Sequence, residues 1–103
     1  MPYQAKAFRI AFLTLLLLII NRTGAMEISN IVDSDNMAAQ LAEVYIANIY
    51  GKEAAERQKP YLVSQANGYW QVKGVMQKRQ LGGTFEIHIA KDDGRVLLLT
   101  HSR

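Results

Sequence analysis

The sequence predicts an α+β domain in which an N-terminal helix and a short second helical segment pack on a four-stranded antiparallel sheet. Apolar residues recur at helical spacing between positions 37 and 49, and they alternate with a period of two after Pro60. An Asn-Gly pair at 67–68 and an Asp-Asp-Gly stretch at 92–94 supply turns between strands. With 103 residues, the chain has room for one small domain.

Residues 1–25 have the layout of a secretory signal peptide. Lys6 and Arg9 form a basic start, an apolar run follows over residues 10–20, and the small residues at 23–25 resemble a cleavage site. The apolar run is roughly half the length of ~20 residues that a transmembrane helix needs. We therefore expect cleavage after Ala25 and export to the periplasm. Residues 26–103 would then form a single domain without a membrane anchor.

The net charge of +3 belongs to this N-terminal segment. Removing Lys6, Arg9 and Arg22 leaves the remaining basic residues equal in number to the 9 acidic ones, so the electrostatic case for nucleic-acid binding is lost. The chain has no cysteine, which excludes disulfide scaffolds, thiolate metal sites and cysteine nucleophiles.

A helix is expected after the sequence Asp33-Ser34-Asp35, whose side-chain oxygens suit a helix N-cap. Gly51 should end this helix, because a glycine accepts the left-handed conformation common after the last turn. Lys52–Gln58 is expected to form a short, exposed second helical segment that stops before Pro60. The apolar stripe expected to face the core comprises Met37, Leu41, Val44, Tyr45 and Ile49.

The first two strands are expected at 61–66 and 69–76, joined by the Asn-Gly turn. In the second strand, Trp70 and Val72 share one face, whereas Tyr69, Gln71 and Lys73 lie on the other. A loop over residues 77–83 then leads to the third strand.

The third strand shows the clearest alternation in the chain. Phe85, Ile87 and Ile89 should line the core, while Glu86 and His88 point outward. The turn at 92–94 leads into the last strand, which is expected over residues 95–101.

The register of the last hairpin has two solutions. A three-residue loop pairs Ile89 with Leu97 and Ile87 with Leu99, whereas a two-residue loop opposes Ile89 to Leu98. We favour the three-residue loop because it continues the buried face of the third strand.

In the favoured register, Val96 and Leu98 lie on the outer face beside His88 and form an exposed apolar patch with a polar border. Such a patch suits contact with a partner protein, and it suits self-association equally. The candidate partner-binding residues are Gln71, Lys73, Glu86, His88, Val96, Leu98 and His101.

The sequence offers little support for catalysis. Glu86 and His88 lie two positions apart on one strand face, which is compatible with an acid–base pair or with two metal ligands. A third ligand is missing from the pattern, and Gly82-Gly83-Thr84 lacks the lysine and the following helix of a phosphate loop. We therefore predict a binding module that is not an enzyme and uses neither a cofactor nor a metal.

A set of short motifs follows in order along the chain from about Ala39 to the C-terminus. The motifs are Tyr50-Gly51, Lys59-Pro60-Tyr61, Trp70-Gln-Val-Lys-Gly74, Gly82-Gly83-Thr84-Phe-Glu86-Ile, Lys91-Asp-Asp-Gly94-Arg-Val-Leu97 and His101. This order of motifs resembles the NTF2-fold immunity protein family of bacterial toxin systems. The resemblance implies a compact cystatin-like or NTF2-like α+β fold, and a protein that neutralises a cognate toxin by binding it. Because export is predicted, the toxin would act in the periplasm.

A different class of function also fits these residues. The alternative is a periplasmic PepSY-like binding or inhibitory module that regulates a protease or cell-wall enzyme of its own cell. Its partner would be encoded away from the gene and there would be no toxicity to relieve. A small enzyme using Glu86 and His88 is a third hypothesis, which replacement of both residues would test.

Overall fold

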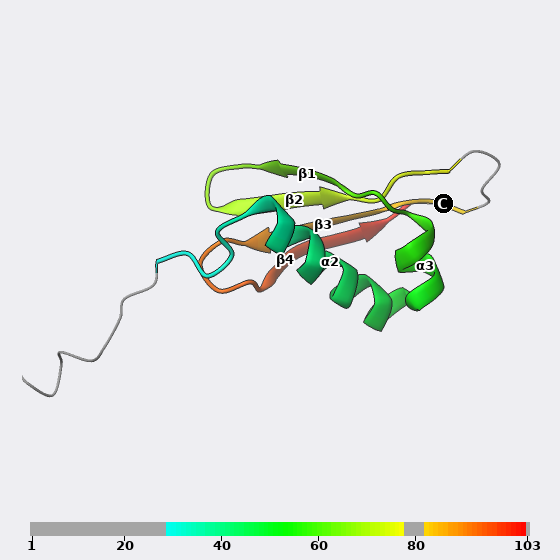
Figure 1. Ribbon diagram of the computed structural model, residues 1–103, viewed down its shortest axis with the longest axis horizontal. Coiled ribbons are helices and arrows are strands. Elements are labelled where there is room, and N and C mark those ends of the chain that lie inside the picture. Colours follow the sequence, from blue (N-terminus) through cyan, green and yellow to red (C-terminus); the bar gives the residue numbers. More distant parts are fainter. Residues whose placement is uncertain (1–28, 78–81, 103) are drawn as a thin grey trace, which may run out of the picture.

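The computed structural model describes residues 29–77 and 82–102, so the predicted signal peptide lies outside the described residues (Figure 1). The predicted α+β class is confirmed. Among the described residues, no helix has the length and apolar character needed to cross a bilayer. The elements in chain order are α2 (Asp35–Tyr50), α3 (Lys52–Arg57), β1 (Leu62–Gln65), β2 (Tyr69–Lys73), β3 (Phe85–Ala90) and β4 (Val96–His101).

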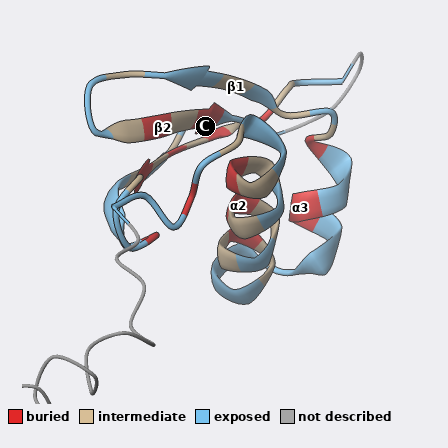
Figure 2. Cartoon of the chain, turned by 60° about the vertical axis from the view of Figure 1, so that its left-hand side comes forward, coloured by how far each residue is buried: buried red, intermediate tan, exposed pale blue. Residues whose placement is uncertain are grey.

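The sheet is an antiparallel meander of four strands in the order β1-β2-β3-β4, which leaves β1 and β4 as its edges. Helices α2 and α3 lie on one side of it, and α2 packs across β1, β2 and β3 (Figure 1). The buried residues of α2 and of the strands meet between these two layers (Figure 2). We call the sheet surface that faces the helices the inner face and the opposite surface the outer face.

The ends of α2 follow from its capping residues. Ser34 is the N-cap, and its side-chain oxygen accepts a hydrogen bond from the backbone N–H of Met37 at 3.2 Å. At the other end, Gly51 donates its backbone N–H to the carbonyl of Ala47 at 3.0 Å. Gly51 has the expected positive φ of 100°, but its ψ of 153° lies outside the left-handed helical region and lets α3 start at the next residue.

The buried face of α2 differs from the predicted stripe. Ala38, Ala42 and Ile46 are fully buried, whereas Val44 and Ile49 are 63% and 52% exposed. The two alanines allow the helix backbone to approach the sheet closely, and this turns the larger side chains of the stripe to the border of the core or into solvent. Three members of the predicted stripe pack at that border, namely Met37, Leu41 and Tyr45.

The expectation that the second helical segment is exposed was wrong in part. One side of α3 is buried, because Ala54 and Ala55 contribute to the core. As in α2, alanines give this short helix a flat face that fits against its neighbours.

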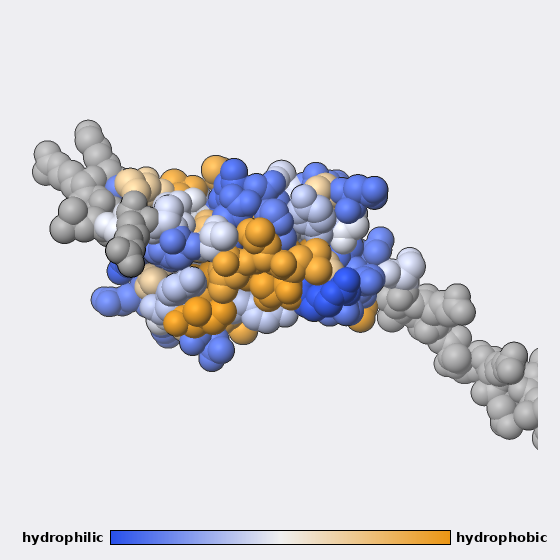
Figure 3. Space-filling model, turned by 180° about the vertical axis from the view of Figure 1, so that it is seen from behind, coloured by the Kyte–Doolittle hydropathy of each residue, from blue (hydrophilic) through white to orange (hydrophobic). Residues whose placement is uncertain are grey.

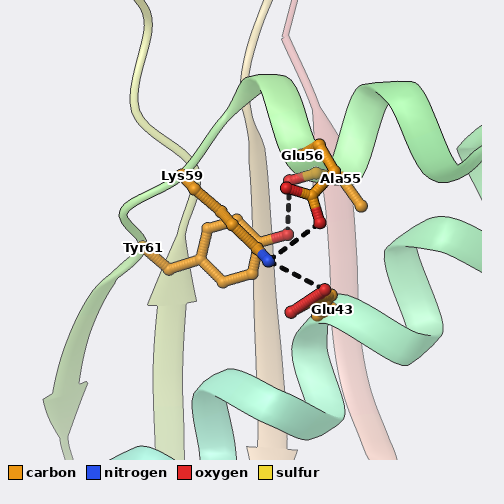
Figure 4. Close-up of polar contacts among 5 residues, drawn as sticks. All are labelled: Glu43, Ala55, Glu56, Lys59 and Tyr61. Atoms are coloured by element: carbon orange, nitrogen blue, oxygen red, sulfur yellow. Dashed lines mark hydrogen bonds and ion pairs between the residues drawn. The ribbon is translucent and has the colours of Figure 1, made fainter.

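Polar contacts hold α3 against α2 and the start of β1 (Figure 4). The ammonium of Lys59 lies 2.9 Å from a carboxylate oxygen of Glu43 and 3.0 Å from one of Glu56, and these hydrogen bonds raise the pKa of Lys59. The Tyr61 hydroxyl donates to the backbone carbonyl of Ala55 at 2.6 Å. Burial, followed by the charge of Glu43, raises the pKa of Tyr61 to about 12.

The inner face of the sheet is formed by the residues that period-two alternation predicts. Trp70, Val72, Phe85, Ile87 and Ile89 are all buried. The first hairpin is also as predicted, since its strand ends are closed by a hydrogen bond from the backbone N–H of residue 66 to the carbonyl of residue 69 at 2.9 Å. β2 ends at residue 73, three residues earlier than expected.

The last hairpin has a longer loop than either solution considered from the sequence. Gly94 donates its backbone N–H to the Ala90 carbonyl at 2.9 Å, and Ala90 in turn donates to the Arg95 carbonyl at 2.9 Å. This arrangement places residues 91–94 in the loop.

β4 accommodates the extra loop residue by forming a β-bulge. Ile87 pairs with Leu99 as predicted, but Ile89 pairs with Val96, and the register shifts between the two pairs so that Leu97 has no partner on β3. The predicted pairing of Ile89 with Leu97 was therefore wrong. Because directly opposed residues share a sheet face, Val96 lies on the side of Ile89 and not on the outer face beside His88.

Candidate functional site

The outer face of β2 and β3 carries a polar network centred on one carboxylate. A Glu86 oxygen lies 2.7 Å from Nε2 of His88 and accepts a hydrogen bond from the Gln71 amide at 3.1 Å. The other Glu86 oxygen lies 3.8 Å from the ammonium of Lys73. We call these four residues the Glu86 cluster.

The antiparallel register explains why these side chains meet. Lys73 lies directly opposite Glu86, and Gln71 lies opposite His88, so all four residues share the outer face. Alternation along each strand predicts the face of each residue, but the contacts depend on the register between β2 and β3. The connection between these strands runs from residue 74 to residue 84, and a connection of that length does not determine the register.

One member of the site is missing from the sequence-based candidates. The ring of Tyr69 stacks on that of His88, with 4.9 Å between centroids and 25° between planes. The alternation of β2 places Tyr69 on the same face as Gln71, and this pattern could have identified Tyr69 from the sequence. The stack covers one side of the imidazole and leaves the His88 side chain only 17% exposed.

The outer face continues from the Glu86 cluster to β4. Leu98 lies opposite His88, as predicted, and Thr100 lies opposite Glu86. In the view from behind, hydrophobic side chains gather over β4 next to hydrophilic ones (Figure 3). Val96, Leu97 and Leu98 are 38%, 47% and 40% exposed. A polar cluster therefore borders an exposed apolar strand.

His101 lies apart from the Glu86 cluster. It is opposite the buried Phe85, its Nε2 is 3.4 Å from the side-chain nitrogen of Gln58, and its ring lies 4.8 Å from that of Tyr50. These contacts place His101 on the inner face. His101 and Val96 therefore lie apart from the other predicted contact residues.

The outer face combines a polar cluster with exposed apolar side chains. In the cluster, the carboxylate of Glu86 already has partners in His88, Gln71 and Lys73. The described part of the chain contains no group of three side chains able to hold a metal ion. Depressions lined by described residues lie over α2, over α3 and beside β1. The outer face offers hydrogen-bonding groups and apolar side chains.

Comparison with known proteins identifies two relatives from Escherichia coli (strain K12). The uncharacterized protein YhhH is 40% identical over 81 residues, which cover 78% of this chain and 64% of YhhH. The uncharacterized protein YbbC is 40% identical over 77 residues, which cover 74% of this chain and 63% of YbbC. The chain thus spans less than two thirds of the length of either relative.

No solved structure gives a significant match to this chain. A family model described as "NTF2 fold immunity protein" matches residues 37–103. The matched segment includes nearly all of α2, the whole of α3, strands β1 to β4 and the Glu86 cluster. The chain therefore belongs to the NTF2 fold immunity protein family.

Proposed function

We propose that this protein is exported to the periplasm, where it binds a cognate bacterial toxin and neutralises it. The match of residues 37–103 to an immunity protein family carries this proposal. The basic, apolar and small-residue pattern of residues 1–25 supports export. An immunity protein must meet its toxin in the compartment where the toxin acts, so export implies a toxin that acts outside the cytoplasm.

The outer face is the surface that suits the toxin best. Glu86 and Lys73 supply charges of both signs, and Gln71 and His88 supply hydrogen-bonding groups. Leu98, next to them on β4, provides apolar area. Polar groups in a defined pattern give specificity, while burial of neighbouring apolar atoms contributes affinity.

The function is tested by rescue from toxicity. The product of the neighbouring gene is directed to the periplasm of a host, with and without this protein, and survivors are counted. We expect protection by the full chain and none by a chain that lacks residues 1–25. A harmless neighbour, or no protection when the full chain is present in the periplasm, would contradict the proposal and favour the PepSY-like regulatory module.

The contact surface is tested with two matched charge reversals. Glu86→Lys should abolish protection, because it replaces the carboxylate at the centre of the cluster with a second ammonium beside Lys73. Glu53→Lys makes the same change on the exposed surface of α3 and should protect like the wild type. Circular dichroism would establish that both variants are folded. Protection by a folded Glu86→Lys variant would place the toxin on another surface.

A further inference from the structure

The β-bulge of β4 separates two inward-facing residues, Val96 and Leu99, by two residues instead of one. Each of these two stands opposite a buried isoleucine of β3. A regular strand would have one outward residue between them, because successive side chains alternate between the faces. In a bulge, two residues of one strand oppose a single residue of its neighbour, and here Leu97 and Leu98 share the place opposite His88. The outer face therefore carries two leucine side chains at the place of one.

We call Leu97 and Leu98 the leucine pair. Their side chains are 47% and 40% exposed, whereas the next residue, Leu99, packs against the core. In the view from behind, the hydrophobic side chains that gather over β4 border hydrophilic ones (Figure 3). Adjacent apolar side chains with a polar border resemble the centre of a protein interface, where a partner buries apolar area and the rim stays polar.

The carboxylate of Glu86, next to the leucine pair, has an oxygen that a partner can reach. Its Oε2 lies 2.7 Å from Nε2 of His88 and accepts a hydrogen bond from the Gln71 amide at 3.1 Å, and these contacts hold the side chain in place. Its Oε1 lies 3.8 Å from the ammonium of Lys73, which is longer than a hydrogen bond. Because the side chain is 33% exposed and already ordered, Oε1 can accept from a donor on another molecule at little cost in conformational entropy.

The charges at the other end of the leucine pair are acidic on balance. In the loop that precedes β4, the carboxylates of Asp92 and Asp93 both lie 2.9 Å from one guanidinium nitrogen of Arg95. The ammonium of Lys91 belongs to the other side of the sheet, where it lies 5.1 Å from the centroid of the buried Trp70 ring. Two carboxylates thus stand against one cation, and electrostatic complementarity favours a basic partner surface.

We propose that the leucine pair is the apolar anchor of the toxin contact, and that the toxin places a basic side chain beside it on Oε1 of Glu86. This inference rests on the proposed function, because it names the chemistry of the toxin surface that the outer face binds. That surface combines an apolar side chain, buried against Leu97 and Leu98, with a guanidinium or ammonium group. The apolar contact supplies affinity, and the charge fixes the orientation of the complex.

The anchor is tested by calorimetry with the purified product of the neighbouring gene and variants of the full chain. Leu97→Gln should weaken binding by about tenfold or more, because a polar side chain of similar size replaces buried apolar area. Leu97→Met keeps that area and should bind like the wild type. Ile49→Gln is the matched control, since Ile49 is 52% exposed on α2, on the other side of the sheet, and it should also bind like the wild type. Urea midpoints would establish that all variants are folded.

The sign of the toxin charge is tested by removing the cation that approaches Oε1 of Glu86. Lys73→Gln should strengthen binding by about two- to fivefold, since this ammonium no longer competes with a basic side chain of the toxin. Lys52→Gln removes the same charge at the exposed start of α3 and should change the affinity by less than about twofold. Weaker binding by Lys73→Gln would mean that the toxin presents an acidic group to Lys73, and it would overturn the proposal.

The outcomes separate this inference from the proposed function. If the wild type neither binds the neighbouring product nor protects against it, the proposed function fails and this inference fails with it. If the wild type protects but Leu97→Gln binds within about twofold of it, or no more weakly than Ile49→Gln, only this inference is overturned. A Leu97→Gln chain that does not fold would also overturn it, because Leu97 would then belong to the core.

Discussion

The side-chain oxygen of Gln58 accepts a hydrogen bond from the backbone N–H of Phe85 at 2.9 Å. Gln58 is fully buried, and its backbone carbonyl accepts a second hydrogen bond from the N–H of Val75 at 2.8 Å. A single residue that follows α3 thus fixes both the chain leaving β2 and the first residue of β3. These two segments flank the connection between the strands that carry the Glu86 cluster.

Replacing Gln58 should therefore destabilise the whole domain. In Gln58→Leu, the buried N–H of Phe85 loses its acceptor, and the cost of such an unsatisfied donor is about 1–3 kcal/mol. Urea denaturation would measure this loss as a lower midpoint. Gln40→Leu, at an exposed position of α2, is the control and should change the free energy of unfolding by less than about 0.5 kcal/mol. Equal midpoints for the two variants would contradict the role assigned to Gln58.

Gly74 is required because the Gln58 side chain occupies the space beside it. A Cβ atom at position 74 would lie 2.9 Å from Cβ and 3.0 Å from Cδ of Gln58, and it would overlap with the side-chain oxygen that bonds Phe85. We expect Gly74→Ala to cost about 1–3 kcal/mol by displacing this side chain.

A double-mutant cycle separates this clash from a backbone effect. Gly74→Ala should cost less in a Gln58→Ala background, because the shortened side chain leaves room for the added methyl group. Additive losses, measured by urea denaturation of the four proteins, would show that the glycine is needed for another reason.

The chain that precedes α2 is held by the single tryptophan. The indole N–H of Trp70 donates to the Val32 carbonyl at 2.8 Å in the buried core. Val32 itself donates to the Lys91 carbonyl at 3.0 Å, and Ile31 donates to the Asp92 carbonyl at 3.3 Å. Removing the indole N–H therefore weakens the contact between this segment and the loop that precedes β4.

Trp70→Phe should lower the free energy of unfolding by about 1–2 kcal/mol, since the Val32 carbonyl loses a buried donor. Hydrogen exchange of the Ile31 and Val32 amides should accelerate more than exchange in β3. Uniform acceleration throughout the domain would mean that the substitution acts by general loss of packing, and that Trp70 has no special role in holding the segment.

Most of the sheet could be predicted from the sequence, because alternation determines which side chains of a strand share a face. Trp70 and Val72 point inward, and Glu86 and His88 lie on the other side, as expected. The face of α2 was harder to predict. A search for large apolar residues overlooks alanine, yet Ala42 lies at the centre of the contact and Val44 in solvent.

Other features depend on interactions between distant parts of the chain. Gln58 is polar and follows a helix, which is typical of a surface residue, and only the position of Phe85 explains its burial. The bulge at Leu97 depends on how the loop hydrogen bonds close, which turn residues alone do not determine. For the same reason Leu98 was predicted on the correct face of β4, whereas Val96 was placed on the wrong one.

The raised pKa of Tyr61 predicts a loss of stability at high pH. The pKa is raised from 10.0 to about 12, chiefly by burial, so the folded protein retains the phenolic proton over a pH range in which the unfolded chain releases it. The unfolded state then binds fewer protons than the folded state, and stability falls as the pH rises from about 10 towards 12. Deprotonation would also remove the hydrogen bond from Tyr61 to the Ala55 carbonyl.

The loss of stability at high pH that is attributed to Tyr61 can be isolated with the variant Tyr61→Phe. This variant should be less stable than the wild type at pH 8, because it lacks the hydrogen bond to Ala55. Its stability should nevertheless decline less steeply between pH 10 and pH 12, since the residue no longer titrates. Lys59 also has a raised pKa, and its contribution is likewise lost at high pH, but it is present in both proteins and cancels in the comparison. Parallel urea midpoints for the two proteins over this range would exclude Tyr61 as the source of the pH dependence.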